Sequence, residues 1–156
     1  MTTQLEKAER DLVFISYSHK DIAWLERLQT MLKPLVRNKS LSAWDDKQIR
    51  SGQKWRDEIE SALGRAKVAV LLVSPNFLES DFIAERELPP LLKAAEGAGT
   101  KIVWVPVRAC LWQETPIEAY QAAHDPAKPL ASLSEADQDS ALVTICKAIK
   151  AASQRP

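Results

Sequence analysis

Three stretches of this sequence concentrate side chains that could bind or transform a small molecule. Hydroxyl, imidazole, ammonium and carboxylate groups stand together over residues 17–21, Tyr-Ser-His-Lys-Asp. An aspartate pair opens a polar loop over residues 45–52, and residues 74–77, Ser-Pro-Asn-Phe, precede a short segment that holds Glu85 and Glu87. Each stretch follows an apolar run. If those runs are neighbouring strands, the three stretches are candidates for one site.

Several catalytic motifs that depend on fixed spacing are missing from the sequence. It contains neither G-x-x-x-x-G-K-[ST] nor G-x-G-x-x-G, so it has neither of the standard glycine-rich loops that cradle phosphates. Its two histidines, His19 and His124, stand in no zinc-ligand pattern, and no G-x-S-x-G nucleophile elbow occurs. A phosphorelay receiver would need acidic residues where Ser-Tyr-Ser follows the first apolar run. We therefore expect no metal and no cofactor.

The composition describes a globular chain without a dominant charge. Its 156 residues suit a single domain, and 46% hydrophobic with 27% charged residues is enough for a packed core. Lys plus Arg and Asp plus Glu both number 21, so the formal net charge is zero and favours neither nucleic acid nor an anionic membrane as a partner. We expect residues 1–10 to be a polar extension and residues 11–153 to form one domain.

Targeting signals and disulfide patterns are also missing from the sequence. The polar N-terminus lacks the apolar stretch of a signal peptide, and no segment approaches the roughly 20 apolar residues of a membrane span. The two cysteines, Cys110 and Cys146, lie far apart and form no metal-type pair, so we expect buried, reduced thiols. These features predict a cytoplasmic protein.

Apolar runs alternate with helix-like patterns along the chain. Residues 12–16, 68–73 and 102–107 predict buried strands, and residues 41–44 are a weaker candidate. Between them, apolar residues recur at steps of three or four, as on one face of a helix, and residues 18–21 resemble a capping box. This alternation predicts an α/β fold: a flavodoxin-like, doubly wound sheet of four or five parallel strands with helices on both faces.

Two prolines complicate the helix that we expect to begin near Asp81. Pro89 and Pro90 lack the backbone N–H that a helix interior needs, although a first helical turn tolerates proline. The sequence allows either a one-turn helix followed by a new one or a single kinked helix. Glu85 and Glu87 both fall beside this interruption.

The polar stretches should converge in space, because ligands in open α/β sheets bind beyond the carboxyl ends of the strands. Tyr17, Asp45 and Ser74 each come directly after a predicted strand. We therefore expect polar groups that are distant in the sequence to meet at one edge of the sheet.

Three boxes at these positions resemble those of the TIR (Toll/interleukin-1 receptor) domain family, bacterial type. Residues 14–18, Phe-Ile-Ser-Tyr-Ser, look like its opening box, an apolar strand that ends in S-[YF]-[SR]. Residues 44–55, which begin Trp-Asp-Asp, resemble the strand and BB loop that follow. Residues 74–83 and the Glu-Leu pair after them resemble the third box, S-P-x-[YF]-x-x-S-x-[WFY]-[CIV] with E-[LM]. The boxes come in family order and spacing, strongly over residues 11–110 and more loosely beyond.

This resemblance implies an enzymatic activity. Many bacterial, plant and some animal TIR domains cleave NAD+, releasing nicotinamide and leaving ADP-ribose or a cyclic ADP-ribose, and the catalytic members carry a glutamate in the third box. In many of them it lies four residues beyond the box aromatic, which here would be Arg86, whereas Glu87 lies five beyond Phe82. Relatives with the five-residue spacing also exist, so Glu87 is the expected catalytic residue. Glu85 is the competing candidate, since on an ideal helix the two side chains point roughly 200° apart and only one can face the site.

The resemblance also implies which residues contact the substrate. The expected substrate-binding residues are Tyr17, Ser18, His19, Asp45, Gly52 and Phe82. Most have a structural alternative: residues 17–19 could end a strand and cap a helix, Asp45 could form a turn, and Phe82 could pack inward. Gly52 is expected to shape its loop rather than take part in chemistry.

Two functions remain open on the sequence alone. The first is an NAD+ glycohydrolase or cyclase that acts in bacterial immune or stress signalling and self-associates through residues 45–54, the expected BB loop. The alternative is a non-enzymatic TIR–TIR interaction module that serves as a signalling scaffold.

Overall fold

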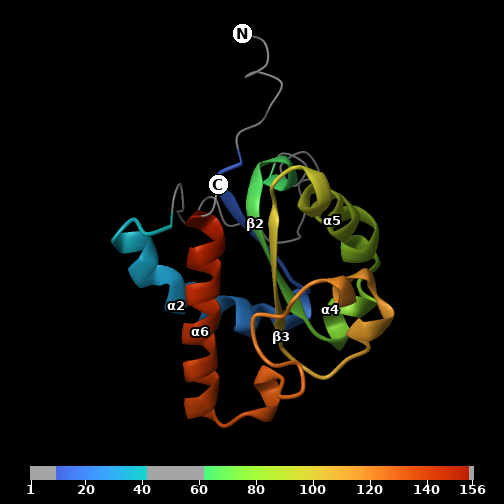
Figure 1. The fold of residues 1–156 in the computed structure, drawn as a ribbon. Coiled ribbons are helices and arrows are strands. Elements are labelled where there is room, and N and C mark those ends of the chain that lie inside the picture. The colour runs from blue at the N-terminus through green and yellow to red at the C-terminus, as the bar shows by residue number, and fades with distance from the viewer. Residues whose placement is uncertain (1–9, 42–61, 155–156) are drawn as a thin grey trace.

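A parallel sheet forms the centre of the computed structural model, which describes residues 10–41 and 62–154. Its strands lie in the order β1-β2-β3, with β1 at Leu12–Ser16, β2 at Ala66–Val73 and β3 at Lys101–Pro106. All pairings are parallel, and helices lie on both faces of the sheet (Figure 1). The α/β fold class and the three main predicted strands are therefore confirmed.

The number of strands agrees with the prediction only as far as the described residues extend. They contain three strands, and the weaker candidate at residues 41–44 begins at the buried Leu41 and otherwise lies outside them. At the outer edge of β3, an isolated parallel bridge joins Trp104 to Ala122, and the Ala123 N–H donates to the Trp104 carbonyl at 2.8 Å. This bridge partly covers the edge strand.

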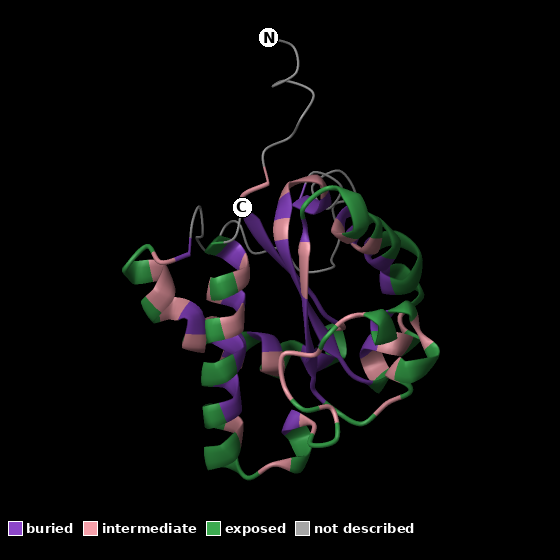
Figure 2. Ribbon diagram, in the orientation of Figure 1, coloured by how far each residue is buried: buried purple, intermediate pink, exposed green. Residues whose placement is uncertain are grey.

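Alternate residues of the strands face two separate apolar layers, as the two-residue period of a strand requires. One face packs against α2 (Ile22–Arg37) and α6 (Glu135–Gln154), and the other packs against α4 (Pro75–Glu79) and α5 (Leu88–Gly97) (Figure 1). Buried residues are concentrated in the strands and on the inner sides of the helices (Figure 2). Val13, Val70 and Val105 represent the first layer, and Phe14, Leu71 and Trp104 represent the second.

The two cysteines are free thiols, as expected. Cys146 is buried in α6, and this burial raises the pKa of its thiol to about 11. Cys110 is only half-buried, which corrects the expectation of two buried thiols, and burial again raises its pKa. Both side chains are therefore weak nucleophiles at neutral pH.

The proline-rich region forms one helical run over residues 81–97, closer to the kinked helix than to two separate helices. Its middle turn, Ile83–Glu87, is a π-helix, and Pro89 and Pro90 lie in the first turn of α5 that follows. The prolines are therefore accommodated without an interruption of the helix.

Candidate functional site

The candidate site lies at the carboxyl edge of the sheet, where β1 and β2 end. Ser16 closes β1 and pairs with Leu71 of β2, and Ser74 follows the last residue of β2. Both serines are buried, at 1% and 0% exposure. The parallel register brings these two strand ends together, so the segments after them meet as the sequence predicted.

Glu87 is the most deeply buried carboxylate at this edge. It ends the π turn with no exposed surface, and the Ser16 hydroxyl donates to its Oε1 at 2.6 Å. Within the part of the chain that the structure describes, its Oε2 is buried and accepts no hydrogen bond. Oε1 is thus hydrogen-bonded to the last residue of β1, whereas Oε2 can still accept a hydrogen bond from a further donor.

The surroundings of Glu87 favour its neutral form. Burial raises its pKa from 4.5 to about 7, and the hydrogen bond from Ser16 opposes this rise because it stabilises the charged form. The Glu87 carboxyl group therefore ionises less readily than an exposed glutamate. Such a displaced pKa in a carboxyl group at a strand edge is a feature of functional sites.

Glu85, the competing candidate, lies on the opposite side of the same helical run. Its side chain is exposed, whereas Glu87 is buried, so only Glu87 faces the sheet. Arg86, which stands at the four-residue spacing from Phe82, is exposed as well.

A second carboxylate, Asp21, ties the two strand ends together. It is 4% exposed and accepts hydrogen bonds from the Ser74 hydroxyl at 2.5 Å and from the Asn76 amide at 3.0 Å. The same Ser74 oxygen accepts the Phe77 N–H at 3.0 Å and so caps the first turn of α4. Asp21 therefore fixes the segment after β1 to the segment after β2.

A hollow of about 250 Å³ opens on the surface between the segments that follow β1 and β2. The residues that line it are Tyr17, Ser18, His19, Lys20, Asn76, Glu79, Ser80, Phe82 and Ile83. Glu87 does not line it, although Tyr17 follows Ser16 in the chain and Ile83 precedes Glu87 by one turn. Lys20 and Glu79 approach to 3.8 Å at its rim, both largely exposed, so this ion pair adds little stability.

The predicted substrate-binding residues divide into two groups. Tyr17, Ser18, His19 and Phe82 lie together around the hollow, with Phe82 39% exposed there rather than packed inward. Asp45 and Gly52, like the rest of the expected BB loop, lie outside the described residues. The structure thus places four of the six candidates side by side.

The sequence predictions missed the polar partners of the site. Ser16 was identified only as part of a strand box. Asp21 and Asn76 were named within the polar stretches at residues 17–21 and 74–77, but no contact of either side chain was predicted. Ser18 caps the 3₁₀ turn at His19–Asp21, as the predicted capping box requires, and its hydroxyl oxygen accepts the Lys20 N–H at 3.3 Å. The available signal was their position, because each lies at or just beyond the carboxyl end of a predicted strand.

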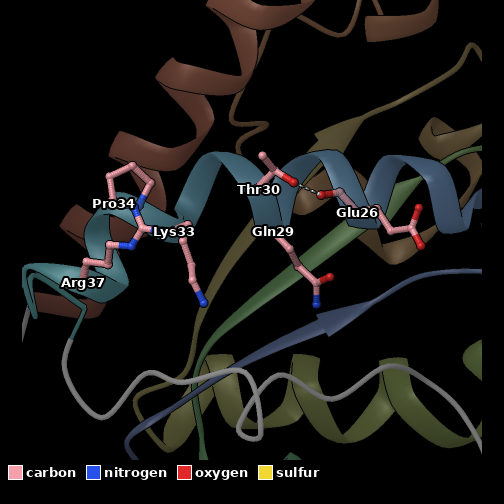
Figure 3. A pocket seen from close by; sticks show the side chains of 6 residues that line it. All are labelled: Glu26, Gln29, Thr30, Lys33, Pro34 and Arg37. Atoms are coloured by element: carbon pink, nitrogen blue, oxygen red, sulfur yellow. Dashed lines mark hydrogen bonds between the residues drawn. The ribbon is translucent and has the colours of Figure 1, made fainter.

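A larger hollow of about 570 Å³ lies on α2, away from this edge (Figure 3). Its described lining consists of six side chains from that single helix: Glu26, Gln29, Thr30, Lys33, Pro34 and Arg37. The Thr30 hydroxyl donates back to the Glu26 carbonyl at 2.9 Å, an ordinary contact within a helix. This hollow contains mixed charges on an open surface and none of the candidate residues.

Residues 10–41 and 62–154 contain no group of three His, Cys, Asp or Glu side chains that is arranged to hold a metal ion. No helix among these residues is long and apolar enough to span a membrane.

Comparison with known proteins identifies the family. The family model of the TIR domain matches residues 13–146, most of the chain, so the chain belongs to the TIR domain family, whose members serve in signalling. It is also similar to the uncharacterized protein y4lF of Sinorhizobium fredii (strain NBRC 101917 / NGR234), with 27% identity over 143 residues. These residues are 92% of this chain and 44% of that protein, so the chain spans less than half the length of this curated relative.

Proposed function

We propose that this TIR domain cleaves NAD+, releasing nicotinamide and leaving ADP-ribose or a cyclic ADP-ribose, with Glu87 as the catalytic residue. The observation that carries the proposal is the Glu87 carboxylate, buried at the carboxyl edge of the sheet, with one oxygen held by Ser16 and the other without a partner among residues 10–41 and 62–154. A buried carboxylate without a second partner is costly, and a substrate hydroxyl that donated to Oε2 would relieve that cost.

The chemistry needs only one carboxylate. Nicotinamide leaves NAD+ as a neutral molecule from a cationic nitrogen, so no acid is required to expel it. The transition state resembles an oxocarbenium ion, as in glycoside hydrolysis, and a nearby anion stabilises the developing positive charge where water is excluded. The ionised carboxylate of Glu87 would supply that anion, and its free Oε2 could hold or deprotonate a ribose hydroxyl.

The hollow between the segments that follow β1 and β2 is where we expect the rest of NAD+ to bind. Phe82 offers an exposed ring for stacking against nicotinamide or adenine, and Tyr17 and His19, whose ring centroids lie 6.1 Å apart, line the same hollow. Because Glu87 has no exposed surface in the single chain, the substrate must displace neighbouring side chains to reach it. We propose that self-association through residues 45–54 assists this step.

A scaffold without enzymatic activity is the second candidate function. The complete burial of Glu87 favours it, because a carboxyl group that no substrate reaches serves only the fold. The shared family membership is compatible with both candidates.

An assay at high protein concentration separates the two functions. The protein is incubated with NAD+ near pH 8, alone and with a crowding agent, and the products are resolved by chromatography. We expect nicotinamide release by the wild type, a loss of about 10²–10³-fold in kcat for Glu87→Gln, and little change for the matched control Glu85→Gln. Normal turnover by Glu87→Gln would disprove the catalytic assignment, and no nicotinamide release under any of these conditions would support the scaffold.

A further inference from the structure

The π turn at Ile83–Glu87 contains one residue more than an α-helical turn. The Leu88 N–H donates to the Ile83 carbonyl five residues earlier, where an α-helix would use the residue four earlier. Ile83 and Leu88 are both buried, at 2% and 9% exposure, and both belong to the apolar layer behind the sheet. On an α-helix residues five apart would point about 140° apart, so the wide turn is what allows both to face inward.

Two prolines hold this wide turn in place. An α-helical pattern would need N–H groups at positions 89 and 90 to donate to the carbonyls of Glu85 and Arg86. Pro89 and Pro90 have no N–H, and a proline ring crowds the carbonyl four residues before it. Both effects disfavour a regular α-helical turn at this point and are relieved by a wider one.

We propose that the π turn, held by Pro89 and Pro90, positions the Glu87 carboxyl group against Ser16, and that one of residues 84–86 is an inserted residue that the fold does not need. Glu87 lies at the end of the turn, and the wider turn compensates for the additional residue, so that Glu87 faces Ser16 as it would after an α-helical turn one residue shorter. The three residues before it are exposed, whereas Glu87 is fully buried. The catalytic role of Glu87 rests on the proposed function. The orientation of its side chain toward Ser16 can be tested without any substrate.

Removing one residue from the turn should leave Glu87 in place. Deletion of Glu85 combined with Pro89→Ala and Pro90→Ala would bring Ile83 and Leu88 to the four-residue spacing that shares a face on an α-helix. The two alanines restore the missing N–H groups, so the turn can become α-helical while Ile83 and Leu88 stay buried. An alanine inserted after Arg86 changes the length by the same amount in the opposite direction and should rotate Glu87 away by about 100°. Glu85→Ala is the matched control, because it removes the same carboxylate without changing the length.

Each variant is measured by a carbon-13 NMR titration of the Glu87 carboxyl group, by kcat and KM for NAD+, and by thermal unfolding. The Glu87→Gln variant identifies the NMR signal. We expect the deletion variant and Glu85→Ala to keep a titration near the wild-type value of about 7 and a kcat within a few-fold of it. The insertion variant should titrate in the ordinary glutamate range and lose about 100-fold in kcat, with a smaller change in KM.

Three results would overturn the proposal. One is a deletion variant that fails to fold, because the deleted residue should not be needed. Another is a folded deletion variant whose Glu87 titrates in the ordinary range. The third is an insertion variant that keeps the wild-type titration. If no variant and no wild-type protein cleaves NAD+, the titrations still decide the positioning, while the proposed function fails separately.

Discussion

Two buried carboxylates lie at the same edge of the sheet, and they differ in how completely they are hydrogen-bonded. Asp21 accepts a hydrogen bond on each oxygen, from Ser74 and from Asn76. Glu87 accepts one from Ser16 on Oε1 and, among the described residues, none on Oε2. Both groups bond a serine at a strand end, so their position alone does not distinguish them.

The difference separates a group that holds the fold together from one that is available for chemistry. A carboxylate that already accepts a hydrogen bond on each oxygen gains less from a new donor than one with an oxygen that accepts none. A half-paired carboxylate in a dry environment binds a donor strongly and resists ionisation, which is reflected in the raised pKa of Glu87. Three predictions test this contrast, beginning with the largest expected effect.

Glu87 should make the wild-type protein less stable as the pH rises. Its pKa is about 7 in the folded chain and 4.5 in the unfolded reference, so the folded state holds the extra proton between these values. Stability contributed by this group is therefore complete below about pH 4.5 and is lost as the pH rises to about 7, by about 3 kcal/mol in total. Glu87→Gln removes this dependence.

Urea unfolding of both proteins from pH 4 to pH 8 measures the effect. Glu87→Gln should be close to the wild type in stability at pH 4 and more stable than it at pH 8, while its NAD+ cleavage is lost. A difference in stability that stays constant across this range would show that Glu87 titrates normally and would contradict the contrast with Asp21.

Asp21→Ala should have the opposite effect to Glu87→Gln: we expect a lower free energy of unfolding and a retained kcat for NAD+ cleavage. The change leaves the buried Ser74 hydroxyl and the Asn76 amide without their acceptor, at a cost of about 2 kcal/mol in the free energy of unfolding. Because Asn76 lines the hollow, we expect a higher KM for NAD+ and a nearly unchanged kcat. Steady-state kinetics and urea unfolding check both. A loss of kcat as large as that of Glu87→Gln would mean that the two carboxylates act in the same step.

Ser16→Ala should sharpen the contrast by making Glu87 harder to ionise. The Ser16 hydrogen bond lowers the pKa of Glu87, so its loss should raise that pKa further. We expect the pH at which kcat is half-maximal to move upward by about one pH unit, because the proposed chemistry uses the ionised carboxylate. The pH profile of kcat measures this shift, with Ser140→Ala, at an exposed position of α6, as the control. A profile that moves downward or stays in place would contradict the role given to Ser16.

The sequence predicted the strands and the edge where they end, because uniformly apolar runs and the residues after them are local signals. The first strand, Leu12–Ser16, begins and ends at the predicted residues. Four of the predicted substrate-binding residues line the same hollow: Tyr17, Ser18, His19 and Phe82. The partners of the carboxylates could not be predicted, because those contacts cross the fold. Asp21 sits three residues after Ser18, as in a helix cap, yet its carboxylate bonds Ser74, which is 53 residues away.

The π turn could not be predicted either. Two prolines indicated an interruption, but the choice between a break and a wide turn depends on packing at both ends, where Ile83 and Leu88 must face the same layer. The wide turn also explains the five-residue spacing between Phe82 and Glu87. A turn with one more residue brings Glu87 to the side that a four-residue spacing reaches on an α-helix.

The hydrogen bond between Ser16 and Glu87 joins residues 71 positions apart, and this separation affects how the protein is made. During synthesis the strand that carries Ser16 leaves the ribosome long before Glu87 does. The entropy of closing so long a loop must be overcome before the bond can form, so it belongs to the late, non-local part of folding. A nascent chain therefore has no assembled site, and any consumption of a cellular dinucleotide begins only once the sheet is complete.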